Sequence, residues 1–270
     1  MNGVARTAVG AAWLRARESE RPDRLFEDPY ASAFVAAADA RSPQAGRGSG
    51  AGDLFGAHLV FRTRFFDDHL SGSGCDQVVL LAAGFDARAY RLDWPPGVRL
   101  FELDLPELLA FKEGVLRGLA ATARCERVPV PADLREDWPG RLRAAGFDPA
   151  RPTAWLIEGL LIYLGPAEAG RLLDGVGALS AAGSRLAFEY DPAAAAVLAE
   201  RVRTMPELRR IATLWKGGPG EDVVARLAAR GWRARTVEAS ALAGRYGRPA
   251  PRGGFLTAVL SDADHHNSPE

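Results

Sequence analysis

The stretch from Gln77 to Leu92, QVVLLAAGFDARAYRL, constrains the fold more than any other part of the chain. It opens with an apolar run, continues with a turn at Gly84 and ends in residues typical of the start of a helix. A run that is apolar at every position is typical of a strand buried on both faces, as in parallel sheets covered by helices. The stretch therefore predicts the first strand, turn and helix of an α/β nucleotide-binding domain.

Further apolar runs along the chain predict a sheet of seven strands. With the first run at 77–82, the runs lie at 98–103, 126–130, 153–157, 184–190, 232–238 and 254–260. Helical periodicity between most of them is typical of a doubly wound sheet. The last connection is short and contains the Gly/Pro-rich stretch GRYGRPAPRGG, which permits a final antiparallel strand. We predict a mostly parallel, seven-stranded sheet.

The residues before this sheet have helical periodicity. We expect helices from Thr7 to Glu20, from about Pro29 to Ala38, and from Leu54 to Ser71. Asp28 is the expected N-cap of the second helix, because Asp is favoured there and a proline follows it. The Gly/Ser/Pro-rich residues 40–53 are expected to form a loop.

Composition argues against several classes of function. The 270 residues include 34 basic and 34 acidic side chains, so we expect neither a nucleic-acid nor a membrane surface. The two cysteines, Cys75 and Cys125, form no CxxC pair, which argues against a disulfide framework and a cysteine-type zinc site. The apolar stretch AVGAAWL near the N-terminus is too short for a signal sequence or a membrane span. We therefore expect a cytoplasmic protein.

The turn after the first strand carries one glycine where a dinucleotide fingerprint carries three. Gly84 can adopt a positive φ, but the preceding positions 82 and 83 are both alanine. Asp86 follows two residues after Gly84, and its charge would repel a phosphate. The turn is thus poorly suited to NAD or FAD and better suited to a nucleoside without phosphates.

Acidic residues end the next three strands. Asp104 lies 20 residues after Gly84, where an acid binds ribose hydroxyls, and Glu102 is the alternative on the same side of the strand. Asp133 with Leu134 ends the third strand, where a carboxylate and a backbone amide can meet an adenine. Glu158 ends the fourth. S-adenosylmethionine has the ribose, adenine and positive charge that these positions predict, and it has no phosphate.

Each of these residues also has a structural interpretation. Gly84 is compatible with any strand-to-helix turn, and Asp86, Asp104 and Asp133 with helix caps. A purely structural role explains Glu158 less well, because Glu158 interrupts an apolar run and a buried acid needs a partner.

Several blocks together resemble the bacterial branch of the leucine carboxyl methyltransferase family. They are ARTAVGAAWLRARESERPDRLFEDPYA, FRTRFFDDHL, QVVLLAAGFDARAYRL, FELDLP, PADLRE and LIEGLLIYL. They follow the family's order over about residues 5 to 190. The resemblance implies a class I methyltransferase: a Rossmann-like sheet with an N-terminal helical cap, a lid inserted after the fifth strand and S-adenosylmethionine as cofactor.

The resemblance also implies roles for single residues. Gly84, with neighbouring Ala83 and Leu103, would lie against the methionine and ribose part of the cofactor, and Asp104 would bind the ribose. Asp133 and Leu134 would hold the adenine, and Glu158 would lie near the methionine amino group.

Arginines are implied at the methionine carboxylate. Arg62 is the better match and Arg64 the second choice, which leaves Arg64 as a candidate for substrate binding; both are also compatible with a solvated helix face. The family adds a basic residue from the N-terminal helix, for which Arg15 and Arg17 are candidates.

The sequence leaves the methyl acceptor open. A carboxylate acceptor needs no base, whereas a phenol does, because its pKa is about 10. His58 and His69 are expected to be half-exposed in the third helix, so the sequence offers no persuasive base and mildly favours a carboxylate. Tyr163 and Tyr190 are candidates for the acceptor pocket or for the core.

The resulting hypothesis is an O-methyltransferase acting on a small molecule, such as a polyketide or another secondary metabolite, or on a peptide terminus. A non-catalytic S-adenosylmethionine-binding module and a nicotinamide oxidoreductase are the alternatives. We expect no metal site, and a homodimer is compatible with the sequence. The single domain is expected to consist of a cap (1–71), a cofactor-binding core (72–190), a lid (191–220), C-terminal strands with a helix (221–262) and a flexible tail (263–270).

Overall fold

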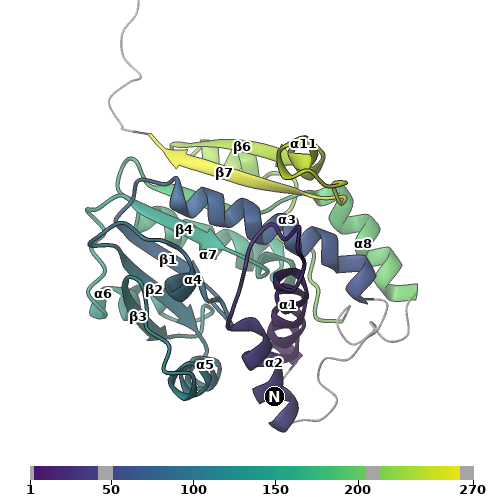
Figure 1. The fold of residues 1–270 in the computed structure, drawn as a ribbon. Coiled ribbons are helices and arrows are strands. Elements are labelled where there is room, and N and C mark those ends of the chain that lie inside the picture. Colours follow the sequence, from purple (N-terminus) through teal and green to yellow (C-terminus); the bar gives the residue numbers. More distant parts are fainter. Residues whose placement is uncertain (1–2, 42–50, 205–212, 262–270) are drawn as a thin grey trace, which may run out of the picture.

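The computed structural model describes residues 3–41, 51–204 and 213–261, which form an α/β protein around one seven-stranded sheet (Figure 1). The strands are β1 (Gln77–Leu81), β2 (Arg99–Asp104), β3 (Glu126–Pro131), β4 (Thr153–Ile157), β5 (Arg185–Glu189), β6 (Trp232–Glu238) and β7 (Gly254–Leu260). Each predicted apolar run is therefore a strand, with ends that differ by one residue at most.

Helices surround the sheet. They are α1 (Gly3–Ser19), α2 (Ala31–Arg41), α3 (Ala51–Ser71), α4 (Arg88–Arg91), α5 (Pro106–Gly118), α6 (Trp138–Ala144), α7 (Pro166–Ala178), α8 (Pro192–Thr204), α10 (Val223–Ala228) and α11 (Ala243–Tyr246). The described residues also form the 3-10 helices η1 (Leu161–Tyr163) and η3 (Ala239–Leu242).

The strand order is β3-β2-β1-β4-β5-β7-β6. The first five strands pair in parallel, whereas β7 pairs antiparallel with both β5 and β6. The chain leaves β1 toward β2 and β3, and later continues on the other side of β1 with β4 and β5. The topological switch point, where a ligand is expected in such a sheet, is therefore at the carboxyl ends of β1 and β4.

Two apolar clusters cover the two faces of the sheet. Every residue of β1 is buried, with Val78 and Leu80 on one face and Val79 and Leu81 on the other. The first face packs against α1, α2, α3 and α5, and the second against α6, α7 and α10. This burial on both faces is the reason that the strand is apolar without alternation.

The N-terminal helices form a cap on the first face, where α3 runs in front of the sheet in Figure 1 and contacts α1. The predicted start of the second helix is wrong by two residues, since α2 begins at Ala31. Asp28 still forms a bond typical of an N-cap, because its carboxylate accepts from the Tyr30 N–H at 3.1 Å. The same carboxylate accepts from the Arg15 side chain.

Parts of several predicted segments lie outside the described residues. This applies to 42–50 of the expected loop, to 205–212 of the expected lid and to 262–270, which include the expected tail. In the part of the chain that is described, no helix is both long and apolar enough to cross a membrane.

Candidate functional site

The turn after β1 is closed by the carboxylate that ends β2. Ala82 and Gly84 both have positive φ, 59° and 48°, so the backbone turns sharply between the strand and α4. The Gly84 N–H donates to Asp104 Oδ2 at 2.6 Å, and the Leu105 N–H donates to Oδ1 at 2.7 Å. The Ala83 N–H donates to the Leu103 carbonyl at 2.9 Å, which joins the ends of β1 and β2. Turn and carboxylate therefore form one rigid unit.

Asp104 is the acid that reaches this edge of the sheet, and its side chain is largely buried. Burial raises the pKa of Asp104, although the two backbone N–H groups act in the opposite direction. Glu102, the alternative left open by the sequence, lies inside the protein. Its carboxylate forms ion pairs with Lys112 at 2.8 Å and with Arg127 at 2.7 Å. The position of Glu102 thus has a structural explanation.

The end of β3 carries Asp133 and Leu134. The Asp133 carboxylate accepts from the side chain and the backbone of Arg135, and the side-chain bond holds the pKa of Asp133 below its usual range. Leu134 is half-buried against the second apolar cluster. Both residues follow β3 at the same sheet edge as Asp104, as predicted.

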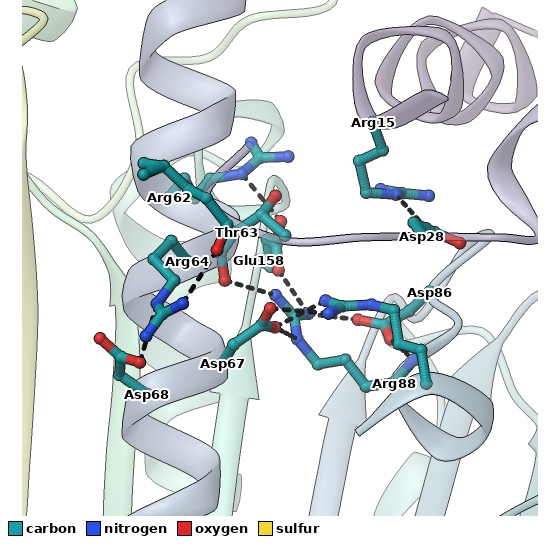
Figure 2. A network of polar contacts seen from close by, with 12 residues as sticks. Arg15, Asp28, Arg62, Thr63, Arg64, Asp67, Asp68, Asp86, Arg88 and Glu158 are labelled. Carbon is teal, nitrogen blue, oxygen red and sulfur yellow. Dashed lines mark hydrogen bonds and ion pairs between the residues drawn. The ribbon is translucent and has the colours of Figure 1, made fainter. Parts of the chain in front are cut away.

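A buried guanidinium, Arg88, joins three elements around the switch point (Figure 2). Its Nε donates to Asp67 Oδ1 of α3 at 2.6 Å, and its Nη1 donates to Glu158 Oε2 at 2.7 Å. Nη1 also pairs with Asp86 in the turn after β1. Arg91, one turn further, pairs with Asp67 as well. This cluster ties the cap helix α3 to the ends of β1 and β4.

Arg62 forms the second half of the network. Its Nε donates to Glu158 Oε1 at 2.9 Å and its Nη1 to Glu189 Oε1 at 2.7 Å. Glu189 ends β5, and its other oxygen accepts from the Gly159 N–H at 2.8 Å. Glu158 therefore lies between two arginines, Arg62 and Arg88, at the point where the sheet topology predicts a ligand.

The network favours the ionised forms of Asp86 and Glu158. Burial alone would raise the pKa of Asp86, but Arg88, Lys112 and Arg91 outweigh it and lower the pKa to about 2. For Glu158 burial is likewise opposed by Arg88 and Arg62, and the pKa is lowered.

Arg15 is the N-terminal arginine that reaches the turn. Its Nη2 donates to the Phe85 carbonyl at 2.8 Å and its Nε pairs with Asp28 at 2.9 Å. Arg17 is exposed and stacks over the Trp13 ring at 4.9 Å. Of the two candidates, Arg15 therefore lies beside the proposed site.

The candidates for substrate binding are not gathered in this network. Arg64 points away from Glu158 in Figure 2 and contacts Asp68 and the Leu25 carbonyl. The Tyr190 hydroxyl donates to the Glu221 carbonyl at 2.9 Å. Tyr163 lies in η1, shortly after β4, and is half-buried. Their roles stay predictions.

Sequence reasoning missed Arg88 and Glu189. Glu189 had a usable signal, since it is an acid at the end of an apolar run, as Glu158 is. For Arg88 the local sequence shows only the neighbouring Asp86. Its other partners come from α3 and from after β4, and only the fold brings them together.

The site as a whole carries negative formal charge. Four carboxylates (Asp67, Asp86, Glu158 and Glu189) pair with three arginines (Arg62, Arg88 and Arg91), and Asp104 binds the backbone of the turn beside them. The sum is 3 − 5 = −2, and Arg15 cancels Asp28. An anionic phosphate is disfavoured here, whereas a ligand with net positive charge is favoured. Within the described ranges, no three His, Cys, Asp or Glu side chains gather as metal ligands would.

Comparison with known proteins places the chain among methyltransferases. Residues 8–177 match the model of the family described as leucine carboxyl methyltransferase. A Parafrankia protein named "Putative S-adenosyl-L-methionine-dependent methyltransferase" is 51% identical over 269 residues, covering 95% of this chain and 87% of the relative. A protein of the same name from Streptomyces avermitilis is 44% identical and covers 96% of each chain.

Solved structures share the fold. A DUF574 family protein from Streptomyces avermitilis has a TM-score of 0.58 at 15% identity, covering 93% of this chain and 97% of its own. The crystal structure of a "putative methyltransferase" from Thermobifida fusca has a TM-score of 0.53 at 17% identity, with 93% and 94% covered.

Proposed function

The chain belongs to the leucine carboxyl methyltransferase family, and on this premise we propose that it transfers the methyl group of S-adenosylmethionine to an oxygen atom. The enzyme is an S-adenosylmethionine-dependent methyltransferase. The proposed acceptor is a carboxylate or hydroxyl of a small molecule or of a peptide terminus.

The observation that carries the proposal is the sheet edge at the switch point. This edge has a net negative charge, and its turn contains a single glycine. S-adenosylmethionine has a sulfonium, an ammonium and a carboxylate group, and thus a net charge of about +1 at neutral pH. The ion pairs around Arg62 and Arg88 have a net charge of 3 − 4 = −1, and Asp104 adds a further carboxylate at the same edge, which complements this cation. NAD would place two phosphate charges beside Asp86 and Asp104, where no glycine-rich cradle compensates them.

The proposed roles follow the positions along the edge. Asp104 would accept from the ribose hydroxyls through lone pairs that Gly84 and Leu105 leave free, because a carboxylate has about four acceptor sites. Asp133 and the backbone of Leu134 would meet the adenine. Ala83 and Leu103 would form the surface beside them.

The methionine end of the cofactor would meet charged groups. Glu158 would accept from its ammonium group, and Arg62 would pair with its carboxylate. The bonds of Arg62 to Glu158 and Glu189 use Nε and Nη1, so Nη2 takes part in neither. The methyl group is already activated by the sulfonium, so the protein's task is to align the acceptor and exclude water.

The test is methyl transfer from cofactor with a labelled methyl group to paired probes, 2-naphthoate and 2-naphthol. Mild alkali releases label as methanol from a methyl ester but leaves a methyl ether intact, so the two oxygen acceptors are distinguished. We expect label in one of these fractions, and an extract of secondary metabolites extends the same assay. Transfer to nitrogen or sulfur acceptors alone would contradict the proposal. Tight cofactor binding without any transfer would indicate a non-catalytic binding module.

A further inference from the structure

His58 lies one helical turn before Arg62, on the same face of α3. Its half-buried ring stacks on the Phe255 ring, with the centroids 5.8 Å apart and the planes at 23°. Phe255 pairs with Glu189 across β5 and β7, so the imidazole lies beside the end of β5. His58, which the sequence did not suggest as a base, therefore lies next to the network around Glu158.

The backbone before β7 is shaped around this ring. A Cβ atom at Gly253 would lie 2.8 Å from His58 Nδ1 and 2.9 Å from Cε1, closer than real Cβ atoms come. Gly253 also has a φ of 123°, which other residues rarely adopt. The Arg252 backbone acts to raise the pKa of His58. The Nδ1 and Cε1 atoms of the ring therefore lie against the Gly253 backbone.

The charged groups around His58 come from three directions. Glu189 ends β5, Glu158 follows β4, and Arg62 lies on α3 itself. Burial lowers the pKa of His58, and Arg62 adds to this, whereas Glu189 and Glu158 act against it. The imidazole is consequently neutral at physiological pH and able to accept a proton, with two carboxylates near enough to stabilise the imidazolium.

The strand order leaves one part of the sheet edge for an acceptor. The ends of β1, β2 and β3 carry the nucleoside positions, and Glu158 after β4 is the position for the methionine end. The remaining part of the edge is the end of β5 and the start of β7, where His58 lies.

We propose that His58 is the catalytic base of the transfer and that the acceptor is therefore an alcohol or a phenol, not a carboxylate. This inference rests on the proposed function. The hydroxyl oxygen forms the bond to the methyl carbon with its own electron pair. The methyl–sulfur bond breaks, its electrons stay on sulfur, and the hydroxyl proton moves to His58 Nε2. Solvent then takes the proton from the imidazolium, so the base is regenerated.

An acceptor-independent test compares S-adenosylmethionine with S-adenosylhomocysteine, since the two differ only in the methyl group and its positive charge. The readout is the pKa of each histidine by NMR titration of the full chain, assigned with His58→Gln and His69→Gln. A histidine within roughly 6 Å of the sulfonium should have its pKa lowered by about 1 unit or more in the first complex relative to the second. His69, near the other end of α3, is the internal control and should not change.

Calorimetry on the same samples separates the two claims. If both ligands bind and the His58 pKa is the same in both complexes, the inference is overturned while the proposed function stands. If neither ligand binds, the proposed function fails and the inference fails with it.

A second readout uses 2-naphthol and 2-naphthoate as acceptor probes. His58→Gln should lower kcat for the hydroxyl probe by about 10²–10⁴-fold with unchanged cofactor affinity, whereas His69→Gln on the same helix should not. Methylation of the carboxylate probe at an undiminished rate in His58→Gln would contradict the proposal. If neither probe is methylated, the NMR comparison decides.

Discussion

Arg88 is the residue on which the site depends most, because a fully buried charge is tolerated only with partners. Its side chain is 2% exposed and pairs with Asp67, Asp86 and Glu158. Loss of the guanidinium would leave Asp86 buried without its main partner. The size of the resulting destabilisation distinguishes a buried ion-pair network from one at the surface.

Arg88→Met should lower the free energy of unfolding by about 3–5 kcal/mol, because it leaves uncompensated buried carboxylates. Urea denaturation of both proteins measures this. The matched control is Arg124→Met. The Arg124 side chain is 52% exposed, and that of its partner Asp93 is 97% exposed. This control substitution should cost no more than about 1 kcal/mol. Equal effects of the two substitutions would contradict the account of the network.

Asp86 should make the protein sensitive to acid. Its pKa is about 2 in the folded protein, below the ordinary value of 3.8, so its contribution is present above about pH 4 and lost as the pH falls toward 2. The shift of the Asp86 pKa corresponds to about 2–3 kcal/mol at ~1.4 kcal/mol per unit.

The comparison with Asp86→Asn isolates this carboxylate. The difference in unfolding free energy between wild type and variant should shrink as the pH falls from about 5 to 2, measured by urea titrations at each pH. A difference that stays constant over this range would show that Asp86 is not held ionised by Arg88.

Single residues at strand ends were predictable from the sequence where local pattern sufficed. Asp104, Asp133 and Glu158 each end an apolar run, and the structure places all three at one edge of the sheet. Partners that arrive from distant segments were not predictable. Arg88 with Asp67 is an example, since the two lie 21 positions apart on different elements.

At the scale of elements, the sheet was predictable because burial on both faces leaves an unambiguous apolar run. Helix boundaries were less so. The helix after the glycine turn is only Arg88–Arg91, because the chain must return at once to begin β2. The antiparallel β7 matches the permitted arrangement, yet the short connection alone could not establish its place between β5 and β6.

The packing of helices against each other gives a prediction at this scale. A Cβ atom at Gly175 of α7 would lie 2.7 Å from Trp138 Cζ2 of α6, whereas one at Gly114 of α5 would meet nothing within 4 Å. Gly175→Ala should destabilise the protein by about 1–3 kcal/mol through overpacking. Gly114→Ala should stabilise it by about 0.5–1 kcal/mol, because alanine is the better helix former.

Thermal or urea unfolding of the two alanine variants checks the pair. The same substitution in two helices should thus give effects of opposite sign. Stabilisation by both would mean that α6 and α7 are less closely packed than the structure indicates.

At the scale of the whole molecule, the two ends of the described chain meet over the first face of the sheet. Arg248, after α11, pairs with Glu18 at the end of α1 at 2.9 Å, and Arg245 of α11 pairs with Asp68 of α3 at 2.8 Å. The cap is therefore held by the C-terminal part as well as by the network around Arg88. The partners lie 230 positions apart in the first pair and 245 − 68 = 177 in the second, so these contacts leave no local signal in the sequence.

This architecture surrounds one charged edge, and its central claim is that the edge binds S-adenosylmethionine. The most direct measurement is calorimetric titration of the protein with S-adenosylmethionine and with NAD, with Asp104→Ala beside the wild type. We expect micromolar binding of S-adenosylmethionine, weakened about tenfold or more in the variant, which corresponds to at least ~1.4 kcal/mol. NAD should not bind. Binding of NAD alone, or an Asp104→Ala variant that binds S-adenosylmethionine as well as the wild type does, would contradict the account of this site.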